Sequence, residues 1–115
     1  MKTVTLQRFQ KAREQRVEAG GYVIIIRRPS PYEIEGARVR GESHGLDFAC
    51  AFVAGWEDVL ESDILPGGDP EPVGFDADVF RAWIKERPEL WAPLIDGVVS
   101  AYNTWAEARE KKGNA

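Results

Sequence analysis

The chain has few of the residues that build redox and catalytic centres. Its 115 residues include one cysteine, one histidine and one methionine. The single cysteine, Cys50, cannot form a disulfide within the chain, so nothing in the sequence indicates an oxidising compartment. Long hydrophobic runs are also missing, because the longest, FACAFVAG (48–55), is far shorter than the roughly 20 residues that a membrane-spanning helix needs. These absences argue against a disulfide-stabilised scaffold and a helical membrane protein.

A targeting signal is missing too. The first residues, MKTVTLQRFQKAREQR, contain no apolar segment of the kind that secretory signal peptides carry. We therefore expect the protein to stay in the cytoplasm in which it is made. A chain of this length can bury one core and is too short for two, so we expect a single domain over residues 1–115.

Positive charge is missing from the middle of the chain. Residues 45–80 contain nine acids and no base, whereas residues 1–44 contain nine bases and five acids. The net charge of -4 argues against general binding to nucleic acids or to anionic membranes. The uneven distribution could steer a partner or guide self-association, and the simpler interpretation is a set of solvated faces and loops.

The sequence predicts a mostly α, α+β fold, in which four to five helices pack with one short N-terminal β-hairpin at about residues 17–28. The pair Gly20-Gly21 separates a short strand from the β-branched run YVIII, and both central positions of a tight hairpin turn need positive φ. A hairpin alone is marginally stable, so we expect Ile24 and Ile26 to pack on helices.

Capping signals predict two helix starts. Ser30 and Glu33, with a proline between them, fit a capping box, which predicts a helix over about residues 31–40. Asp76 is the expected N-cap of a second helix over residues 76–86.

The spacing of apolar residues predicts further helices. A narrow apolar stripe indicates a basic N-terminal helix over residues 5–16. A final helix covers about residues 89–111, in which Pro93 either kinks the helix or marks its start, and residues 111–115 form a frayed tail. The stretch LDFACAFVAGW is apolar nearly all round, so a helix over residues 46–55 is expected at the centre of the core or at an interface.

The acidic middle of the chain reads as a loop. Glu57 to Asp78 contains eight acids and no base, and prolines and glycines fill residues 57–75. These acids lack the alternating ligands and the sixth-position glycine of a calcium loop. A flexible loop is also a poor place to hold an acid–base pair in two different environments. We therefore predict a solvated acidic loop and no metal site.

Nothing in the sequence predicts an active site. His44 follows Ser43 in an expected turn, but adjacent side chains point apart and no acid lies close in sequence to orient the imidazole. Cys50 falls in an apolar stretch, where an inert buried thiol is expected. We expect no catalytic residue, no cofactor and no enzymatic activity.

The tryptophans offer better candidates for function. All four lie after residue 55. Trp83 and Trp105 fit the apolar faces of helices and are expected in the core. Trp56 and Trp91 lie at the ends of elements, where a partly exposed aromatic ring can anchor an interface.

Several stretches, taken in order, resemble the phage tail assembly chaperone family of long-tailed phages. They are GGYVIIIRRPSPYE, FVAGWEDV and LPGGDPEPVGFDADVFRAWIKERPELWAPLIDGVV, followed by the final amphipathic helix. The resemblance covers about residues 17–105. It implies a small, mostly helical, non-enzymatic protein that binds the tape-measure protein, helps to recruit tail-tube subunits, acts in the host cytoplasm and is absent from the finished virion.

The family brings no catalytic residues to this chain, so the candidates for partner binding rest on physical argument. They are Trp56, Phe75, Trp83, Trp91 and Leu94. A client helix is expected to lie in a groove between helices 76–86 and 89–111, with the acidic loop at its rim. The alternatives are a structural head–tail or tail-completion component of the virion, and a small nucleic-acid-binding regulator that uses the basic N-terminal residues.

Overall fold

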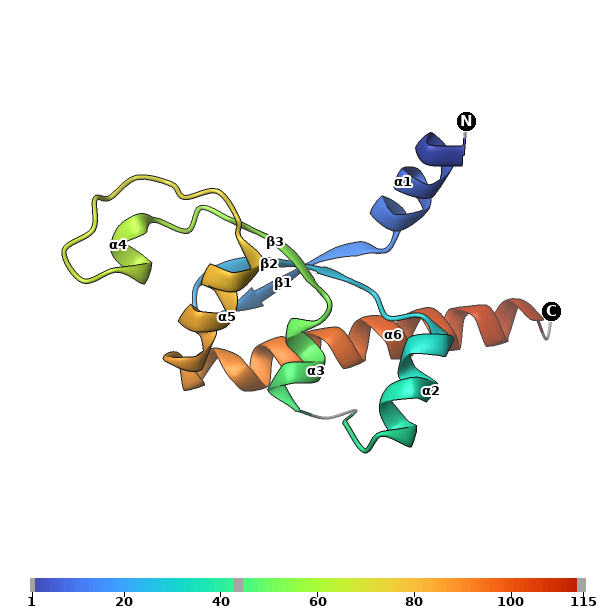
Figure 1. Ribbon diagram of the computed structural model, residues 1–115. Coiled ribbons are helices and arrows are strands. Elements are labelled where there is room, and N and C mark those ends of the chain that lie inside the picture. The colour runs from blue at the N-terminus through green and yellow to red at the C-terminus, as the bar shows by residue number, and fades with distance from the viewer. Residues whose placement is uncertain (1, 43–44, 114–115) are drawn as a thin grey trace.

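The computed structural model describes residues 2–42 and 45–113 (Figure 1). Within them the element order is α1 (Lys2–Ala12), β1 (Glu14–Ala19), β2 (Tyr22–Arg27), α2 (Pro31–Val39), α3 (Leu46–Cys50), β3 (Val53–Glu57), α4 (Glu61–Ile64), α5 (Ala77–Lys85), the 3-10 helix η1 (Pro88–Leu90) and α6 (Trp91–Gly113). The predicted α+β class, mostly helical, is confirmed. Ser43, His44 and the last two residues of the expected tail lie outside the described residues.

The three strands form one antiparallel sheet with β2 in the centre. The predicted hairpin is present, but it spans residues 14–27, since the N-terminal helix ends at Ala12 and the residues that follow pair with β2. Its turn is the expected one, with φ of 56° at Gly20 and 87° at Gly21. A side chain at Gly20 would also collide with Leu90, so this turn fixes the hairpin against the start of α6.

The expected helix over residues 46–55 is wrong in its second half. α3 ends at Cys50, and after a short turn the chain forms β3, which pairs with β2. A stretch that is apolar all round has no period that separates a buried helix from a buried strand. The strand is favoured here because β2 would otherwise leave the backbone groups of a buried edge unpaired.

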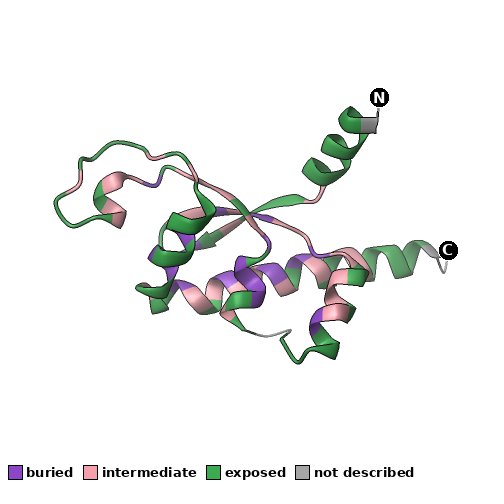
Figure 2. Cartoon of the chain, viewed as in Figure 1, coloured by how far each residue is buried: buried purple, intermediate pink, exposed green. Residues whose placement is uncertain are grey.

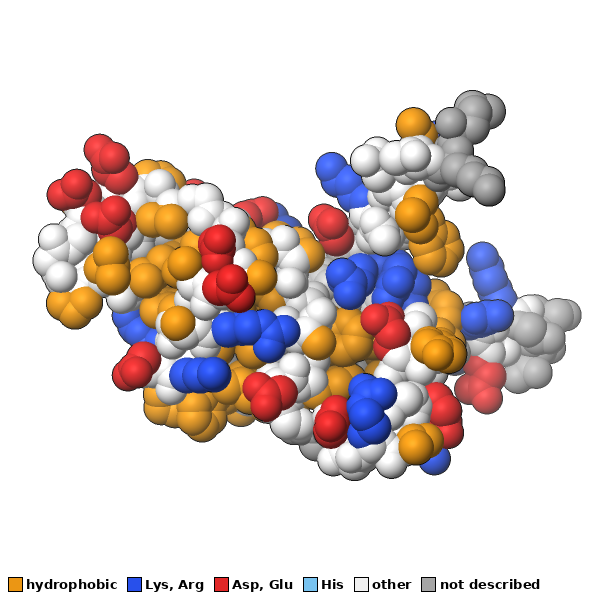
Figure 3. Space-filling view, in the orientation of Figure 1, with side chains coloured by type: hydrophobic (Ala, Val, Ile, Leu, Met, Phe, Trp, Pro, Cys, Tyr) orange, Lys and Arg blue, Asp and Glu red, His pale blue; other side chains and the backbone are white. Residues whose placement is uncertain are grey.

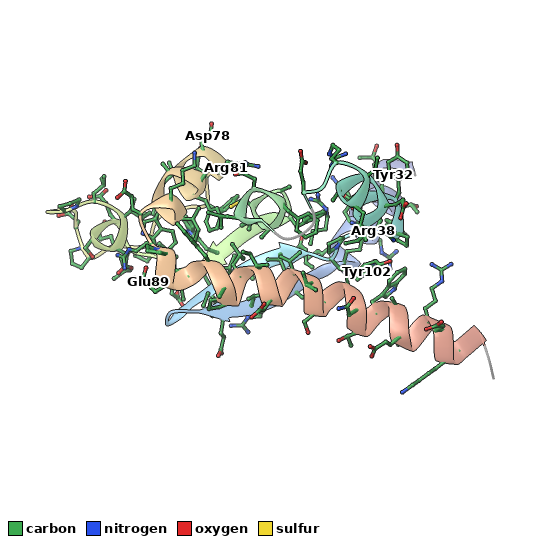
Figure 4. The ribbon with its side chains drawn as sticks, turned by 90° about the horizontal axis from the view of Figure 1, so that it is seen from below. Tyr32, Arg38, Asp78, Arg81, Glu89 and Tyr102 are labelled. Carbon is green, nitrogen blue, oxygen red and sulfur yellow. The ribbon has the colours of Figure 1, made fainter. Side chains whose placement is uncertain are left out.

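The core lies between the sheet and the helices that cover it. α6 runs along β1 and β2, and α5 packs against β3 (Figures 1 and 4). The expected packing of Ile24 and Ile26 on helices is confirmed, because both are fully buried. The largest fully buried side chains of the helices are Phe80, Ile84, Leu90, Leu94 and Val98. Buried residues gather along this helix–sheet contact, whereas α1 and the end of α6 are exposed (Figure 2).

A glycine allows the close approach of α6 to the sheet. A Cβ at Gly97 would lie 2.6 Å from Cγ1 of Val17 on β1, well inside normal van der Waals contact. Val17 cannot move aside easily, because a β-branched side chain on a strand has restricted χ1 rotamers.

We expect Gly97→Ala to lower the free energy of unfolding by about 1–3 kcal/mol, since overpacking outweighs the gain in helix propensity. Urea unfolding followed by circular dichroism measures the change. Gly74→Ala is the matched control, because a Cβ there meets nothing within 4 Å. Unchanged or increased stability of Gly97→Ala would show that α6 and β1 are not packed this closely.

The predicted capping box begins α2. The Glu33 backbone N–H donates to the Ser30 hydroxyl at 3.1 Å, and the Ser30 N–H donates to the Glu33 carboxylate at 3.0 Å. The Arg13 guanidinium also donates to this carboxylate at 2.6 Å. Burial raises the pKa of Glu33, but the hydrogen bonds from Ser30 and Arg13 outweigh it and hold the pKa below its ordinary value.

The lowered pKa gives Glu33 a pH-dependent role in stability. A carboxylate with a depressed folded-state pKa stabilises the fold above its unfolded pKa, and this contribution disappears as the pH falls through the folded-state value. Glu33→Gln should therefore cost about 1 kcal/mol at pH 7, the usual value of a helix cap. The difference from the wild type should shrink as the pH falls below about 4.3. A pH-independent difference in urea unfolding would contradict this role.

Candidate functional site: a groove between α4 and α5

A groove of about 730 Å³ lies between the acidic segment and α5. Its lining residues from the acidic segment are Ser62, Asp63, Ile64, Leu65 and Pro66. Those from α5 and the turn after it are Val79, Ala82, Trp83, Glu86 and Arg87. Leu65 and Val79 are 54% and 39% exposed, so the groove presents apolar side chains to solvent. We call this feature the α4–α5 groove.

An aromatic cluster supports the groove from below. Trp56 of β3 packs edge-to-face on Trp83 of α5 and on Phe75, with ring centroids 5.9 and 5.3 Å apart. Tyr22 of β2 packs edge-to-face on the other side of Trp83, at 5.1 Å. Phe75 and Phe80 flank the start of α5 with ring centroids 6.1 Å apart, as a hydrophobic staple does. The α5 wall of the groove therefore stands on a rigid base.

The acidic segment is an ordered structure and not the flexible loop expected from its prolines and glycines. Leu60 and Pro72 form an isolated β-bridge, and the Ser62 N–H donates to the Asp69 carbonyl at 2.9 Å. The Trp56 indole N–H donates to the Val73 carbonyl at 2.7 Å, which attaches the end of the segment to strand β3. The groove wall is thus held at both of its ends.

Asp63 connects this segment to the rest of the protein. Its carbonyl accepts hydrogen bonds from the Trp83 indole at 3.1 Å and from the Arg87 guanidinium at 2.9 Å. Its carboxylate accepts from the Tyr22 hydroxyl at 3.0 Å and from the Leu60 N–H at 2.8 Å. Burial, and then the hydrogen bond to the Asp63 carboxylate, raise the pKa of Tyr22, so this phenol stays protonated and donates its hydrogen bond.

The electrostatic character of the groove is acidic at its rim. Glu86 lines it, and Asp78 lies two turns earlier on α5, exposed and pointing away from the body of the molecule (Figure 4). Figure 3 shows acidic side chains gathered around the α4 end, with hydrophobic side chains exposed between them. The Arg87 guanidinium, also in the lining, is held by Asp63 and lies 5.7 Å from the centre of the Trp83 ring. The arrangement fits a ligand with an apolar stripe and positive charges beside it.

The structure brings together three of the five residues predicted to bind a partner. Trp56, Phe75 and Trp83 share the aromatic cluster, and Trp83 lines the groove although its side chain is buried. Leu94 is fully buried under the sheet and is a core residue. Trp91 is half-buried, and its indole N–H donates to the Ile84 carbonyl at 2.6 Å, which joins α6 to α5.

The groove does not lie where the sequence placed it. Between α5 and α6 the chain is filled by η1 and by the buried side chains of Ile84 and Leu90. The opening lies on the other side of α5, against α4. The acidic segment, predicted at the rim of a groove between α5 and α6, is instead one wall of the opening beside α4.

Sequence reasoning missed Asp63, Tyr22 and the two exposed apolar residues of the groove. Asp63 is one acid among eight in the run, and nothing marks it as the one that accepts hydrogen bonds from β2 and α5. Leu65 carried a usable signal, since it is a large apolar residue in a polar loop that no periodicity assigns to a core. For Tyr22 the sequence gives no signal of a role at the groove, because it indicates only that this residue lies in a strand.

A second, smaller groove of about 580 Å³ lies between α2 and α3. Tyr32 and Val39, both strongly exposed, lie in its lining with Phe48 and Phe52 beneath. Glu33, Glu35 and Arg40 are also in the lining, and Arg40 is paired with Glu42. Glu42 and Asp47 line it too, so this groove also combines exposed apolar side chains with a mostly acidic lining.

Across residues 2–42 and 45–113, no three His, Cys, Asp or Glu side chains are placed to hold a metal ion. Cys50 is buried as predicted, and this burial raises the pKa of its thiol. None of the helices in this part of the chain has both the length and the apolar character required to cross a bilayer.

Comparisons of the chain with protein-family models, with curated proteins and with solved structures find no match. The resemblance to tail assembly chaperones therefore stays a prediction from the motifs quoted above. The α4–α5 groove is the structural feature that bears on function.

Proposed function

We propose that this protein is a non-enzymatic tail assembly chaperone that binds a helical segment of a tape-measure protein in the α4–α5 groove. The observation that carries the proposal is the exposed apolar lining of the groove, with Leu65 on one wall and Val79 on the other. An amphipathic client helix buries its apolar stripe in such a groove and is shielded from aggregation. Recruitment of tail-tube subunits, action in the host cytoplasm and absence from the virion belong to the same proposal.

The shape of the site supports binding over catalysis. Because the walls of the groove are already ordered, the protein loses little conformational entropy when a client helix binds. The acidic rim favours client segments with lysine or arginine beside the apolar stripe. A structural component of the virion would use similar surfaces, and its presence in purified particles separates that alternative from the chaperone.

Nucleic-acid binding is supported less well, because most of the basic residues on which it depends are engaged within the protein. The guanidinium of Arg13 binds Glu33, that of Arg16 binds Glu57, and that of Arg28 lies 4.0 Å from the centre of the Trp105 ring. Phosphate binding would have to compete with these contacts.

Co-expression with the tape-measure protein encoded in the same gene cluster tests the proposal. We expect the tape-measure protein to be insoluble when made alone and to copurify with this chain when both are made. A client that is soluble unaided and forms no complex would contradict the chaperone function. Detection of the chain in purified virions would favour the structural alternative.

A further inference from the structure

Helix α1 presents an apolar surface that none of the other described residues covers. Every described side chain from residue 3 to residue 12 is exposed, including Leu6 at 56% and Phe9 at 63% (Figure 2). The helix stands away from the sheet and from the other helices (Figure 1). An unsupported helix shorter than about 12–15 residues is marginal in water, so the 11 residues of α1 need a surface to pack on.

The base of α1 is fixed, so the helix projects in a defined direction. The Arg13 guanidinium donates to the Arg28 carbonyl at 2.8 and 2.6 Å and to the Glu33 carboxylate. The Arg28 N–H in turn donates to the Arg13 carbonyl at 2.8 Å. These bonds attach the end of α1 to the start of α2. α1 and α4 lie toward opposite ends of the molecule, so α1 cannot reach the α4–α5 groove of its own chain without breaking this junction (Figure 1).

The surface that α1 needs is present on the same chain, at the other end. The sequence of α1, KTVTLQRFQKA, has no acid, and Arg8 and Lys11 lie beside its apolar residues. The α4–α5 groove offers exposed apolar side chains with Glu86 in its lining, and Asp78 is exposed on the same helix outside the lining. The one base of the lining, Arg87, donates to the Asp63 carbonyl. The lengths also correspond, since at 1.5 Å per residue α1 is about 16 Å long and α5 about 13 Å.

We propose that α1 of one molecule docks in the α4–α5 groove of a second molecule. Phe9 and Leu6 then cover Leu65 and Val79, while Arg8 and Lys11 face the acids of the α5 wall. Such a contact joins two different surfaces, so a docked pair still has one free helix and one free groove, and association continues head to tail into a ring or a short open array. This inference does not depend on the proposed function.

Sedimentation velocity of the full-length chain over a wide concentration range tests the inference. We expect concentration-dependent species larger than a monomer, and weaker association at high salt because exposed charge pairs are screened. Phe9→Asp should weaken association at least about tenfold, as removal of an interface anchor does. Val39→Asp is the matched control, since Val39 is an apolar residue on α2 that is even more exposed, at 78%.

A charge exchange identifies the two surfaces directly. One variant carries Arg8→Glu and Lys11→Glu, and the other carries Asp78→Lys and Glu86→Lys. Each alone should fail to associate, whereas the mixture should associate, because each helix then meets a groove of opposite charge. Circular dichroism confirms that both are folded, as expected for substitutions at exposed residues. A monomeric wild type, association that Phe9→Asp leaves unchanged, or a mixture that stays dissociated would each overturn the inference.

Discussion

Replacing Val79 with Asp should weaken binding of the tape-measure protein by about thirtyfold or more, which corresponds to about 2 kcal/mol for an interface anchor. Val79 is exposed in the wall of the groove, and a carboxylate there places an unpaired charge against the apolar stripe of the client. The loss is expected in the dissociation rate, because the acidic rim that steers encounter is unchanged.

The substitution should leave the fold intact. Val79 lies in the first turn of α5, where a negative charge interacts favourably with the helix dipole. The measurement is surface plasmon resonance with an immobilised client segment, after urea unfolding confirms wild-type stability. Val39→Asp serves again as the matched control. Phe9→Asp removes the α1 contact that competes for the same groove, so it should bind the client at least as tightly as the wild type. If Val79→Asp binds the client as tightly as the wild type, the client does not bind in this groove.

Trp83→Ala should lower the free energy of unfolding by about 3–5 kcal/mol, the usual cost of truncating a buried aromatic residue. The ring is buried against Trp56, Tyr22 and Phe80, and its N–H holds the Asp63 carbonyl. The loss of stability is therefore larger than the cost of the cavity alone, because the hydrogen bond that joins α5 to the α4 wall is lost at the same time.

Trp83→Phe separates the two contributions. It keeps an aromatic ring in the cluster and removes the hydrogen bond to Asp63, which should cost about 1 kcal/mol for the bond itself. Hydrogen exchange of residues 60–65 should accelerate in both variants if this bond anchors the segment. Stability close to that of the wild type in Trp83→Ala would show that the aromatic cluster does not support the groove.

The local parts of the fold were predictable because each depends on a few neighbouring residues. Ser30 and Glu33 form the capping box, Asp76 caps α5 through the N–H groups of Asp78 and Val79, and the two glycines of the hairpin have positive φ. Turn and cap chemistry acts over three or four residues, so the sequence alone is enough to recognise it.

The parts that failed depend on contacts between distant residues. β3 forms because β2 needs a partner about 30 residues later, and an apolar stretch carries no local sign of that pairing. The sequence left open whether Pro93 kinks the last helix or marks its start. In the structure η1 precedes the helix, and α6 starts at Trp91 with Pro93 in its first turn, a position that proline tolerates.

The groove was predicted in character and missed in position for the same reason. Composition predicted the acidic segment, and the positions of Trp56, Phe75 and Trp83 made them candidates, which the structure brings into one cluster. The order in the acidic segment comes from the bonds of Asp63 to Tyr22, Trp83 and Arg87, which join residues 20 or more positions apart. No pattern within a proline- and glycine-rich loop reports such bonds.

Photocrosslinking in the complex with the tape-measure protein tests whether the client binds in the α4–α5 groove. A photoreactive phenylalanine analogue replaces Val79 in one variant, Leu65 in a second and Val39 in a third, and each is co-expressed with the client and irradiated. The account predicts crosslinks to the tape-measure protein from positions 79 and 65 and none from position 39. A complex that forms but crosslinks from position 39 alone would contradict binding in the α4–α5 groove.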